Sequence, residues 1–271
     1  MKTKHLRLMQ RVYIILFFCF MYLPIAYMIV FSFNQSKGYA LFTGFTFKWY
    51  TSLLHNESIL HALWVSLYLA LFSAVIATVL GTAASLGIAS MGRKSRLLVT
   101  NITYITTVNP EIITGISLMM LFVAYQRFAS ELDFLPDNIM GFPTLLIAHI
   151  TFNIPYVILS VGPKLRQMDR NLVDAAMDLG CTWMQAFWKV IIPEIKPGIV
   201  SGALTAFTMS IDDFVISYFT AGSSSSTLAM TIYGMTKKRV SPEINAISTL
   251  LFVTVLVLLA VINVREDRQE R

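Results

Sequence analysis

The sequence predicts an all-α integral membrane protein with six transmembrane helices and one long cytoplasmic loop between the fourth and the fifth. Of its 271 residues, 56% are hydrophobic and only 13% are charged, which is far from the composition of an ordinary soluble domain. A helix needs about 20 mostly apolar residues to cross the hydrocarbon core. Six segments reach this length: residues 12–33, 62–91, 97–125, 139–163, 198–220 and 245–264. We expect them to form a single transmembrane domain over residues 1–271.

The first apolar segment follows the basic stretch "MKTKHLRLMQR". Such a start is also typical of a signal peptide. The apolar run is too long for one, however, and no small-residue cleavage site follows it. We therefore interpret residues 12–33 as the first transmembrane helix.

Basic residues predict the orientation of the chain. They cluster in residues 2–11, 93–96, 164–196 and 265–271, all of which fall on one side of the six predicted helices. The positive-inside rule then places both termini and the 164–197 loop in the cytoplasm. One cluster, Lys237 to Arg239, disagrees because it would lie outside.

Several function classes are excluded by motifs that the sequence lacks. There is no G-x-x-x-x-G-K-[ST] phosphate-binding loop, so we do not expect an ATPase or another enzyme. The four histidines are scattered without metal-ligand spacing, and the two cysteines form no pattern, so neither a metal site nor a catalytic site is expected. The net charge of +6 comes from clusters beside apolar runs, which indicates a membrane face rather than nucleic acid.

The 164–197 loop predicts two short helices. Asn171 can cap the first, with Asp174 three positions on, and Gly180 offers a turn after it. The stretch "TWMQAFWKVIIP" starts the second helix, which we expect to end at Pro193. The first helix carries an apolar stripe at helical spacing, formed by Leu172, Ala175, Ala176 and Leu179. This stripe predicts a partner protein, or alternatively a helix that lies on the bilayer surface.

The same loop resembles the EAA loop of permease subunits of type I ABC importers. That pattern is E-A-A, three residues, G, nine residues and I-x-L-P, and this chain has "DAAMDLG", nine residues and "VIIP". Ala175, Ala176, Gly180 and Pro193 match as they stand, whereas Asp174 replaces the glutamate. Val190 and Ile192 replace the isoleucine and the leucine, with the spacing intact.

The resemblance implies the partners and the role of the loop. In that family the loop forms a coupling helix that sits in a cleft of a cytoplasmic ATPase. The expected coupling residues here are Asp174, Ala175, Ala176, Leu179, Gly180 and Pro193. The implied machine contains a second, related permease, two ATPase subunits that bind ATP and Mg²⁺, and an extracytoplasmic binding protein. Its implied location is the bacterial cytoplasmic membrane, and this chain itself holds no cofactor.

Other stretches resemble the PotC-type permeases of spermidine/putrescine importers, whose second permease is of the PotB type. They are "GFTFKWY", "NPEIITGISLMMLF", "AHITFNIPYVI", "SIDDFVISYF" and "SPEINAIST", which run over most of the chain. The resemblance implies a polyamine substrate. Two alternatives stay open: the same machine with another small solute, such as a different amine, a metal ion or a sulfonate, and a secondary transporter or channel, against which the loop argues.

Three carboxylates interrupt the apolar segments. Asp212 lies 14 residues after Gly198, about 21 Å along a helix, and Glu111 lies 14 residues after Leu97. If both helices start at one level, Glu111 and the Asp212–Asp213 pair converge at one depth. A carboxylate at the bilayer centre costs about 2.5 to 3.5 kcal/mol, so these groups should face protein or water.

Two interpretations of the carboxylates remain open. In the first, one of the aspartates caps a helix end or pairs with a basic or amide side chain. In the second, the three carboxylates form a cation site on the substrate path. Adjacent helical positions are about 100° apart, so the roles of the two aspartates should differ. Pro110 can kink its helix toward the path. The predicted path residues are Glu111, Asp212, Asp213, Asn153 and Tyr156, with His149 one helical turn from Asn153.

Overall fold

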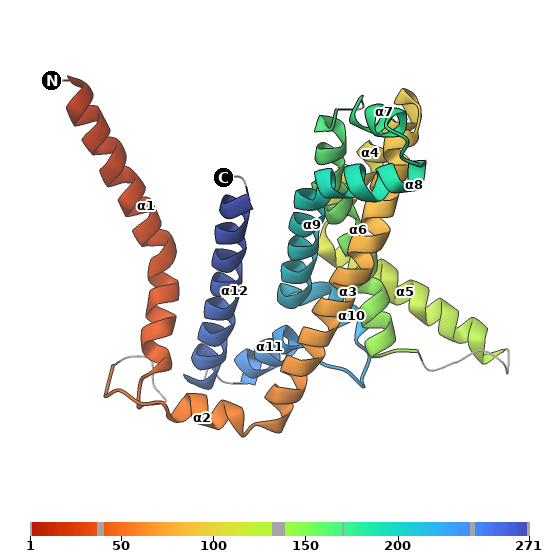
Figure 1. Ribbon diagram of the computed structural model, residues 1–271. Helices are drawn as coiled ribbons and strands as arrows, with labels where there is room; N and C mark the ends of the chain where they lie inside the picture. Colours follow the sequence, from red (N-terminus) through yellow and green to blue (C-terminus); the bar gives the residue numbers. More distant parts are fainter. Residues whose placement is uncertain (1, 37–40, 132–138, 170, 239–241, 270–271) are drawn as a thin grey trace. The chain divides into compact units, whose positions relative to one another are not determined.

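The computed structural model describes residues 2–36, 41–131, 139–169, 171–238 and 242–269, and the described part is almost entirely helical (Figure 1). Arg170, Arg239 and Arg271, which belong to the predicted basic clusters, lie outside the described residues. The chain forms two compact units, residues 1–60 with 232–271 and residues 61–231. The expectation of a single domain therefore stays a prediction.

The first unit is built on the two terminal helices, α1 (Lys2–Ser32) and α12 (Pro242–Gln269). They contact each other, and α12 also contacts the short α2 (Lys48–Leu54). The indole N–H of Trp49 donates to the carbonyl of Asn34 at 2.7 Å, and Ser52 Oγ donates to Glu243 at 3.0 Å. These bonds fix α2 against the end of α1 and the start of α12. Helix α11 (Leu228–Lys238) begins in the second unit and continues in the first.

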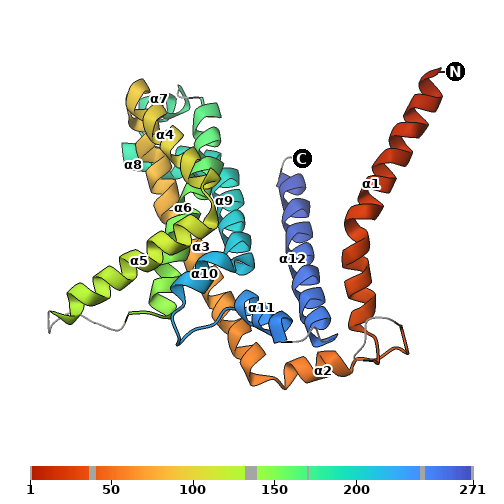
Figure 2. The ribbon, with the colours of Figure 1, turned by 180° about the vertical axis from the view of Figure 1, so that it is seen from behind.

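The second unit contains the candidate sites. Its elements are α3 (Glu57–Ser90), α4 (Arg93–Val108), α5 (Glu111–Ser130), α6 (Phe142–Gln167), α7 (Asn171–Asp178), α8 (Trp183–Ala186), the π-helical η1 (Phe187–Ile191), α9 (Ile192–Asp212) and α10 (Val215–Thr220). Helices α6 and α9 lie side by side and make its most extensive contact (Figure 2). Helix α10 packs mainly against α5.

Glycines let α3 and α9 approach α6 closely. A Cβ on Gly81 would lie 2.7 Å from Val157 Cβ, and one on Gly198 would lie 2.9 Å from the carbonyl oxygen of Ser160. Small residues permit such approaches in membranes, where packing rather than the hydrophobic effect holds helices together. The buried core at this interface consists of Ala74, Ala77, Val157, Val161, Ile195 and Ala206.

Within the part of the chain that the structure describes, five helical stretches are long and apolar enough to cross a membrane. They are Met9–Ser32, Glu57–Ser90, Glu111–Ser130, Phe142–Gln167 and Trp183–Asp212, and a shorter apolar helix covers Pro242–Val257. The prediction of an all-α protein with apolar, membrane-length helices is confirmed. The number of six transmembrane helices stays a prediction.

The prediction of one continuous helix over residues 97–125 is wrong. Helix α4 ends at Val108, Asn109 is extended with ψ 134°, and α5 starts at Glu111. The residue before a proline is disfavoured in the helical region, so Asn109 leaves the helix instead of kinking it. Pro110 is the N-cap of the next helix, and its carbonyl accepts from Ile113 N at 2.9 Å.

The predicted fifth helix also differs at both ends. It does not begin near residue 198, because helical backbone runs from Trp183 to Asp212 and passes through Pro193, where we expected an end. Pro193 lies in the first turn of α9, directly after the π-helical turn η1. A widened turn accommodates the proline ring and its missing N–H. At the other end α9 stops at Asp212, and α10 is a separate helix.

We expect Gly81→Leu to destabilise the second unit, because the added side chain would overlap Val157. Overpacking of this kind costs about 1–3 kcal/mol. Gly87→Leu on the same helix is the matched control, since a Cβ there meets nothing within 4 Å. The midpoint of thermal unfolding in detergent, followed by size-exclusion chromatography, measures the effect. Equal midpoints for the two variants would contradict the close packing of α3 on α6.

Candidate functional site

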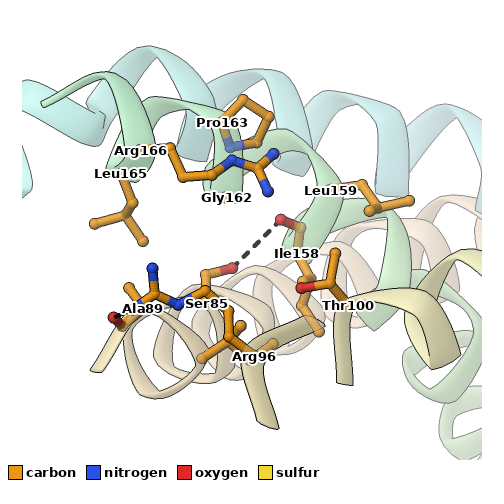
Figure 3. Close-up of a pocket in the computed structure, with 11 residues that line it drawn as sticks. Ser85, Ala89, Arg96, Thr100, Ile158, Leu159, Gly162, Pro163, Leu165 and Arg166 are labelled. Atoms are coloured by element: carbon orange, nitrogen blue, oxygen red, sulfur yellow. Dashed lines mark hydrogen bonds between the residues drawn. The ribbon is translucent and has the colours of Figure 1, made fainter. Parts of the chain in front are cut away.

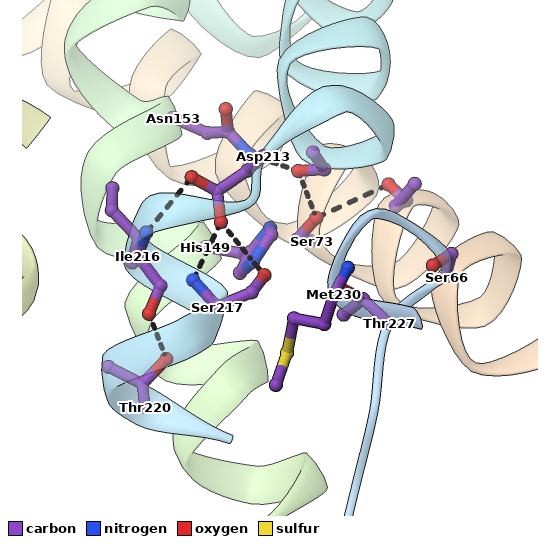
Figure 4. Close-up of polar contacts among 12 residues, drawn as sticks. Ser66, Ser73, His149, Asn153, Asp213, Ile216, Ser217, Thr220, Thr227 and Met230 are labelled. Atoms are coloured by element: carbon purple, nitrogen blue, oxygen red, sulfur yellow. Dashed lines mark hydrogen bonds and ion pairs between the residues drawn. The ribbon is translucent and has the colours of Figure 1, made fainter. Parts of the chain in front are cut away.

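The break between α9 and α10 is held by the carboxylate of Asp213. Its Oδ1 accepts from the backbone N–H of Ile216 at 3.1 Å, and its Oδ2 accepts from that of Ser217 at 2.7 Å (Figure 4). The side chain thus satisfies two of the first N–H groups of α10, which have no partner within the helix. Asp213 is only 9% exposed. This carboxylate is a helix cap, the first of the two interpretations that the sequence left open.

A buried histidine from α6 supports this cap. His149 Nε2 lies 3.1 Å from Ser217 Oγ and 3.5 Å from Asp213 Oδ2. The His149 side chain is fully buried. One turn closer to the start of α6, Thr144 Oγ1 donates to the carbonyl of Thr220 at 2.7 Å. Helix α6 therefore holds α10 at both of its ends.

The polar contacts continue to α9 and α3. Asn153 Nδ2 donates to Ser210 Oγ at 2.7 Å, and Ser210 Oγ lies 2.9 Å from Ser73 Oγ on α3 (Figure 4). All three side chains are buried. We call Ser73, His149, Asn153, Ser210, Asp213 and Ser217 the polar cluster. It joins four helices at the level where α9 ends.

Two buried atoms of the polar cluster have no hydrogen-bond partner among the described residues, His149 Nδ1 and Asn153 Oδ1. Buried polar atoms without a partner are uncommon in folded proteins. The cluster thus keeps one ring nitrogen and one amide acceptor for hydrogen bonds beyond those that hold the helices.

The other predicted path residues lie outside the polar cluster. Asp212 is the last residue of α9 and is exposed, and Glu111 is exposed in the first turn of α5. Tyr156 on α6 is partly buried, and it is near enough to the carboxylate of Glu111 to interact with its charge. Among the described residues, neither carboxylate forms an ion pair. The convergence of the three carboxylates on a substrate path stays a prediction, and Asp213 in addition caps α10.

Helix α5 begins beside α10 because of a glycine. A Cβ on Gly115 would lie 2.9 Å from the ring of Phe219 and 3.5 Å from Ile216 Cα. Glu111 is one turn before Gly115, so its carboxylate belongs to the same part of the fold as α10. Exposed carboxylates beside aromatic rings are suitable acceptors for ammonium groups. Tyr218, exposed on α10 and 5.5 Å from the ring of Phe214, adds such a ring.

Sequence reasoning missed the serines of the polar cluster. A signal exists for Ser73, because Ser66 and Ser73 are seven residues apart on α3, whereas Ser210 and Ser217 lie on the separate helices α9 and α10. Polar residues at this spacing lie on one face of a helix. Ser66 also bonds inside the unit, since its Oγ accepts from the backbone N–H of Leu228 at 2.7 Å.

The predicted coupling loop forms an exposed helical corner. Gly180 adopts φ +89°, the left-handed conformation that favours glycine. Its N–H donates to Met177 O at 2.9 Å, and the N–H of Cys181 donates to Ala176 O at 3.0 Å, which closes the end of α7. Thr182 then caps the start of α8, because its Oγ accepts from Gln185 N. The predicted turn at Gly180 is confirmed.

The cap predicted for α7 differs from the one observed. Asn171 is the first helical residue rather than the cap, and its N–H donates to Asp169 Oδ1 at 3.0 Å. No described residue of α7 is buried. Asp174 and Ala175 are exposed, Ala176 is partly buried, and Leu179 is 87% exposed.

Further apolar side chains enlarge this exposed corner of α7, α8 and η1, which we call the docking corner. They are exposed on α7, α8 and η1: Leu172, Met177, Trp183, Met184 and Trp188. Isolated exposed apolar residues are ordinary, but a set gathered on one short corner is typical of a docking surface. Pro193, the last predicted coupling residue, is exposed in the first turn of α9, directly after η1.

We expect Asp213→Ala to destabilise the second unit by about 1–2 kcal/mol, the usual cost of losing a helix cap. Asp212→Ala serves as the control, because the neighbouring carboxylate caps no helix in the structure. The thermal midpoint of each purified variant is the measurement. A larger loss for Asp212→Ala than for Asp213→Ala would contradict the assignment of the cap.

Comparison with known proteins places the chain in a family. Residues 77–271 match the model of the "binding-protein-dependent transport system inner membrane component". The chain is 38% identical over 242 residues to the putrescine transport system permease protein PotI of Escherichia coli strain K12, covering 89% of this chain and 84% of that one. It is 35% identical over 252 residues to the spermidine/putrescine transport system permease protein PotC of the same organism, covering 93% and 91%.

Solved structures agree on the fold. A bacterial ABC transporter that imports the acidic polysaccharide alginate matches with a TM-score of 0.71 at 16% identity, over 96% of both chains. The alginate transporter in complex with its alginate-bound periplasmic protein matches with a TM-score of 0.73 at 18% identity, over 98% of this chain and 95% of the other. The chain belongs to the family of inner membrane components of binding-protein-dependent transport systems.

Proposed function

We propose that this chain is a permease subunit of an ATP-driven importer that carries polyamines such as spermidine or putrescine. The observation that carries the proposal is its identity of 38% and 35% to two polyamine permeases over about nine-tenths of its length. The exposed carboxylates of Glu111 and Asp212 support it, since each ammonium group of a polyamine needs an acceptor when it leaves water.

The proposal includes the rest of the machine. A second, PotB-like permease completes the pathway, two cytoplasmic ATPase subunits bind ATP and Mg²⁺, and an extracytoplasmic binding protein delivers the substrate. The exposed apolar corner formed by α7 and α8 supports the ATPase contact. Both termini and this corner face the cytoplasm in the proposal, in agreement with the basic clusters at 93–96 and 164–196.

The two kinds of carboxylate have separate tasks in this mechanism. Asp213, with His149 and Ser217, keeps the backbone open between α9 and α10. That break places Asp212 at the free end of α9, while the break at Pro110 places Glu111 at the free start of α5. Broken helices at membrane depth are the usual way in which transport proteins present polar groups to a substrate.

We expect Glu111→Gln or Asp212→Asn to impair polyamine uptake and to spare assembly and basal ATP hydrolysis. Loss of one charge-assisted contact of about 1.5 to 3 kcal/mol weakens cation binding about ten- to a hundred-fold. The variants are assayed in the complete importer with labelled spermidine or putrescine. Glu131→Gln, an exposed residue after the end of α5, is the matched control. Normal uptake by both variants and by the double variant would exclude these two residues from the path.

We also expect Gly180→Arg to abolish uptake without preventing membrane insertion. An arginine is strained at φ +89° and alters the end of α7. Ala176→Arg should act alike, because it adds a long charged side chain to the docking corner. Gln167→Arg, exposed at the end of α6, is the control. Copurification of the ATPase and uptake driven by ATP are measured. A Gly180→Arg variant with full uptake and normal copurification would refute the coupling role.

The importer with its binding protein should show ATP hydrolysis that is stimulated by polyamines. Amino acids and sugars are the comparison substrates. Stimulation by one of these instead of a polyamine would retain the importer and overturn the substrate class. Uptake that depends on an ion gradient and not on ATP would refute the importer itself.

A further inference from the structure

A pocket of about 340 Å³ lies at one end of the second unit, between α3, α4 and α6 (Figure 3). We call it the arginine pocket, because Arg96 projects into it from α4 and Arg166 from the last turn of α6. No acidic residue is among its described lining residues. None of its lining residues belongs to the polar cluster, to the proposed path or to the docking corner.

Arg96 is held in place by two hydrogen bonds, and one of its buried donors has no partner among the described residues. Its Nη2 donates to the carbonyl oxygens of Ala89 at 2.6 Å and Met91 at 2.9 Å, at the end of α3. Its Nε is buried and has no partner among the described residues. A buried donor of a charged group without an acceptor is costly, so capping of α3 alone does not account for this side chain.

The charge of the arginine pocket is not neutralised by the protein. Among the described residues, neither Arg96 nor Arg166 forms an ion pair. Lys164, two residues before Arg166 on α6, adds positive charge nearby in the sequence. Guanidinium groups present several donors in a planar fork that matches the oxygens of a phosphate. The pocket therefore favours a phosphate-bearing anion.

The other residues that line the arginine pocket indicate what kind of phosphate-bearing anion fits it. Ile88, Leu159 and Leu165 supply aliphatic surface, while Ser85 and Thr100 supply hydroxyls. A ligand that satisfies both kinds of surface is an amphiphile. Basic pockets between transmembrane helices near the bilayer surface bind lipid headgroups in this way. We propose that the arginine pocket binds the phosphate group of an anionic phospholipid from the leaflet at this end of α6.

The test uses the complete importer in lipid nanodiscs. Phosphatidylglycerol is titrated into a phosphatidylcholine bilayer, and the copies retained by the complex are counted by native mass spectrometry. Arg166→Gln removes one guanidinium that caps no helix. Gly162→Leu fills the pocket without changing charge, because Gly162 lines it and a Cβ there meets nothing within 4 Å. We expect each variant to bind phosphatidylglycerol about ten-fold more weakly at this site.

Two matched controls separate a site from general surface charge. Arg93→Gln removes the same charge at the start of α4, and Gly87→Leu adds the same side chain at a glycine with equally open space. Both residues lie outside the pocket lining, and both variants should retain phosphatidylglycerol as the wild type does. Equal losses for Arg93→Gln and Arg166→Gln, or no loss for Gly162→Leu, would overturn the proposal.

A further arm distinguishes the source of the phosphate. Millimolar inorganic phosphate is added to the importer in nanodiscs that contain only a small fraction of phosphatidylglycerol. We expect no displacement of the lipid, because the free ion makes none of the aliphatic contacts. Displacement by inorganic phosphate in the wild type, but not in Arg166→Gln, would overturn the lipid assignment in favour of a soluble phosphate.

Discussion

The carboxylate of Asp213 satisfies the backbone where α9 ends and α10 begins, and the rest of the candidate path depends on this bond. In a bilayer no water is available to unpaired N–H groups, so a helix can stop only where protein supplies partners. Asp213 supplies two acceptors, to Ile216 N and Ser217 N, and His149 lies 3.5 Å from the same carboxylate. Because Asp213 is engaged in this way, Asp212 is left as the exposed carboxylate at the end of α9.

Close packing of α3, α6 and α9 supplies the rigid frame for that break. Gly81 and Gly198 let their helices approach α6 until an added Cβ would clash. Ser73, Asn153 and Ser210 then bond across the same three helices, inside the packed interface. Hydrogen bonds of this kind between membrane helices contribute modestly, about 0.6 kcal/mol on average, so packing and polar contacts act together. A frame built this way can carry a short helix such as α10 at a defined position.

One uninterrupted run of helix joins the docking corner to Asp212, a residue of the proposed substrate path. Residues Trp183–Asp212 lead from α8 through the π-helical turn η1 to the end of α9. A movement imposed on α7 and α8 by a bound ATPase would therefore act on the element that carries Asp212.

Composition and local patterns alone were sufficient for the apolar helices, for the turn at Gly180 and for the family resemblance of "DAAMDLG". These depend on residues that are close in sequence, where helical length and glycine geometry decide the outcome. Local patterns could not show that Asn109 and Asp213 end their helices, or that the π-helical turn carries the chain through Pro193. Whether a proline or a carboxylate bends, ends or caps a helix depends on which distant groups satisfy the freed backbone. Only the tertiary structure shows that Asp213, and not its neighbour Asp212, caps α10, because His149, which lies 3.5 Å from the Asp213 carboxylate, comes from α6, some 60 residues earlier in the chain.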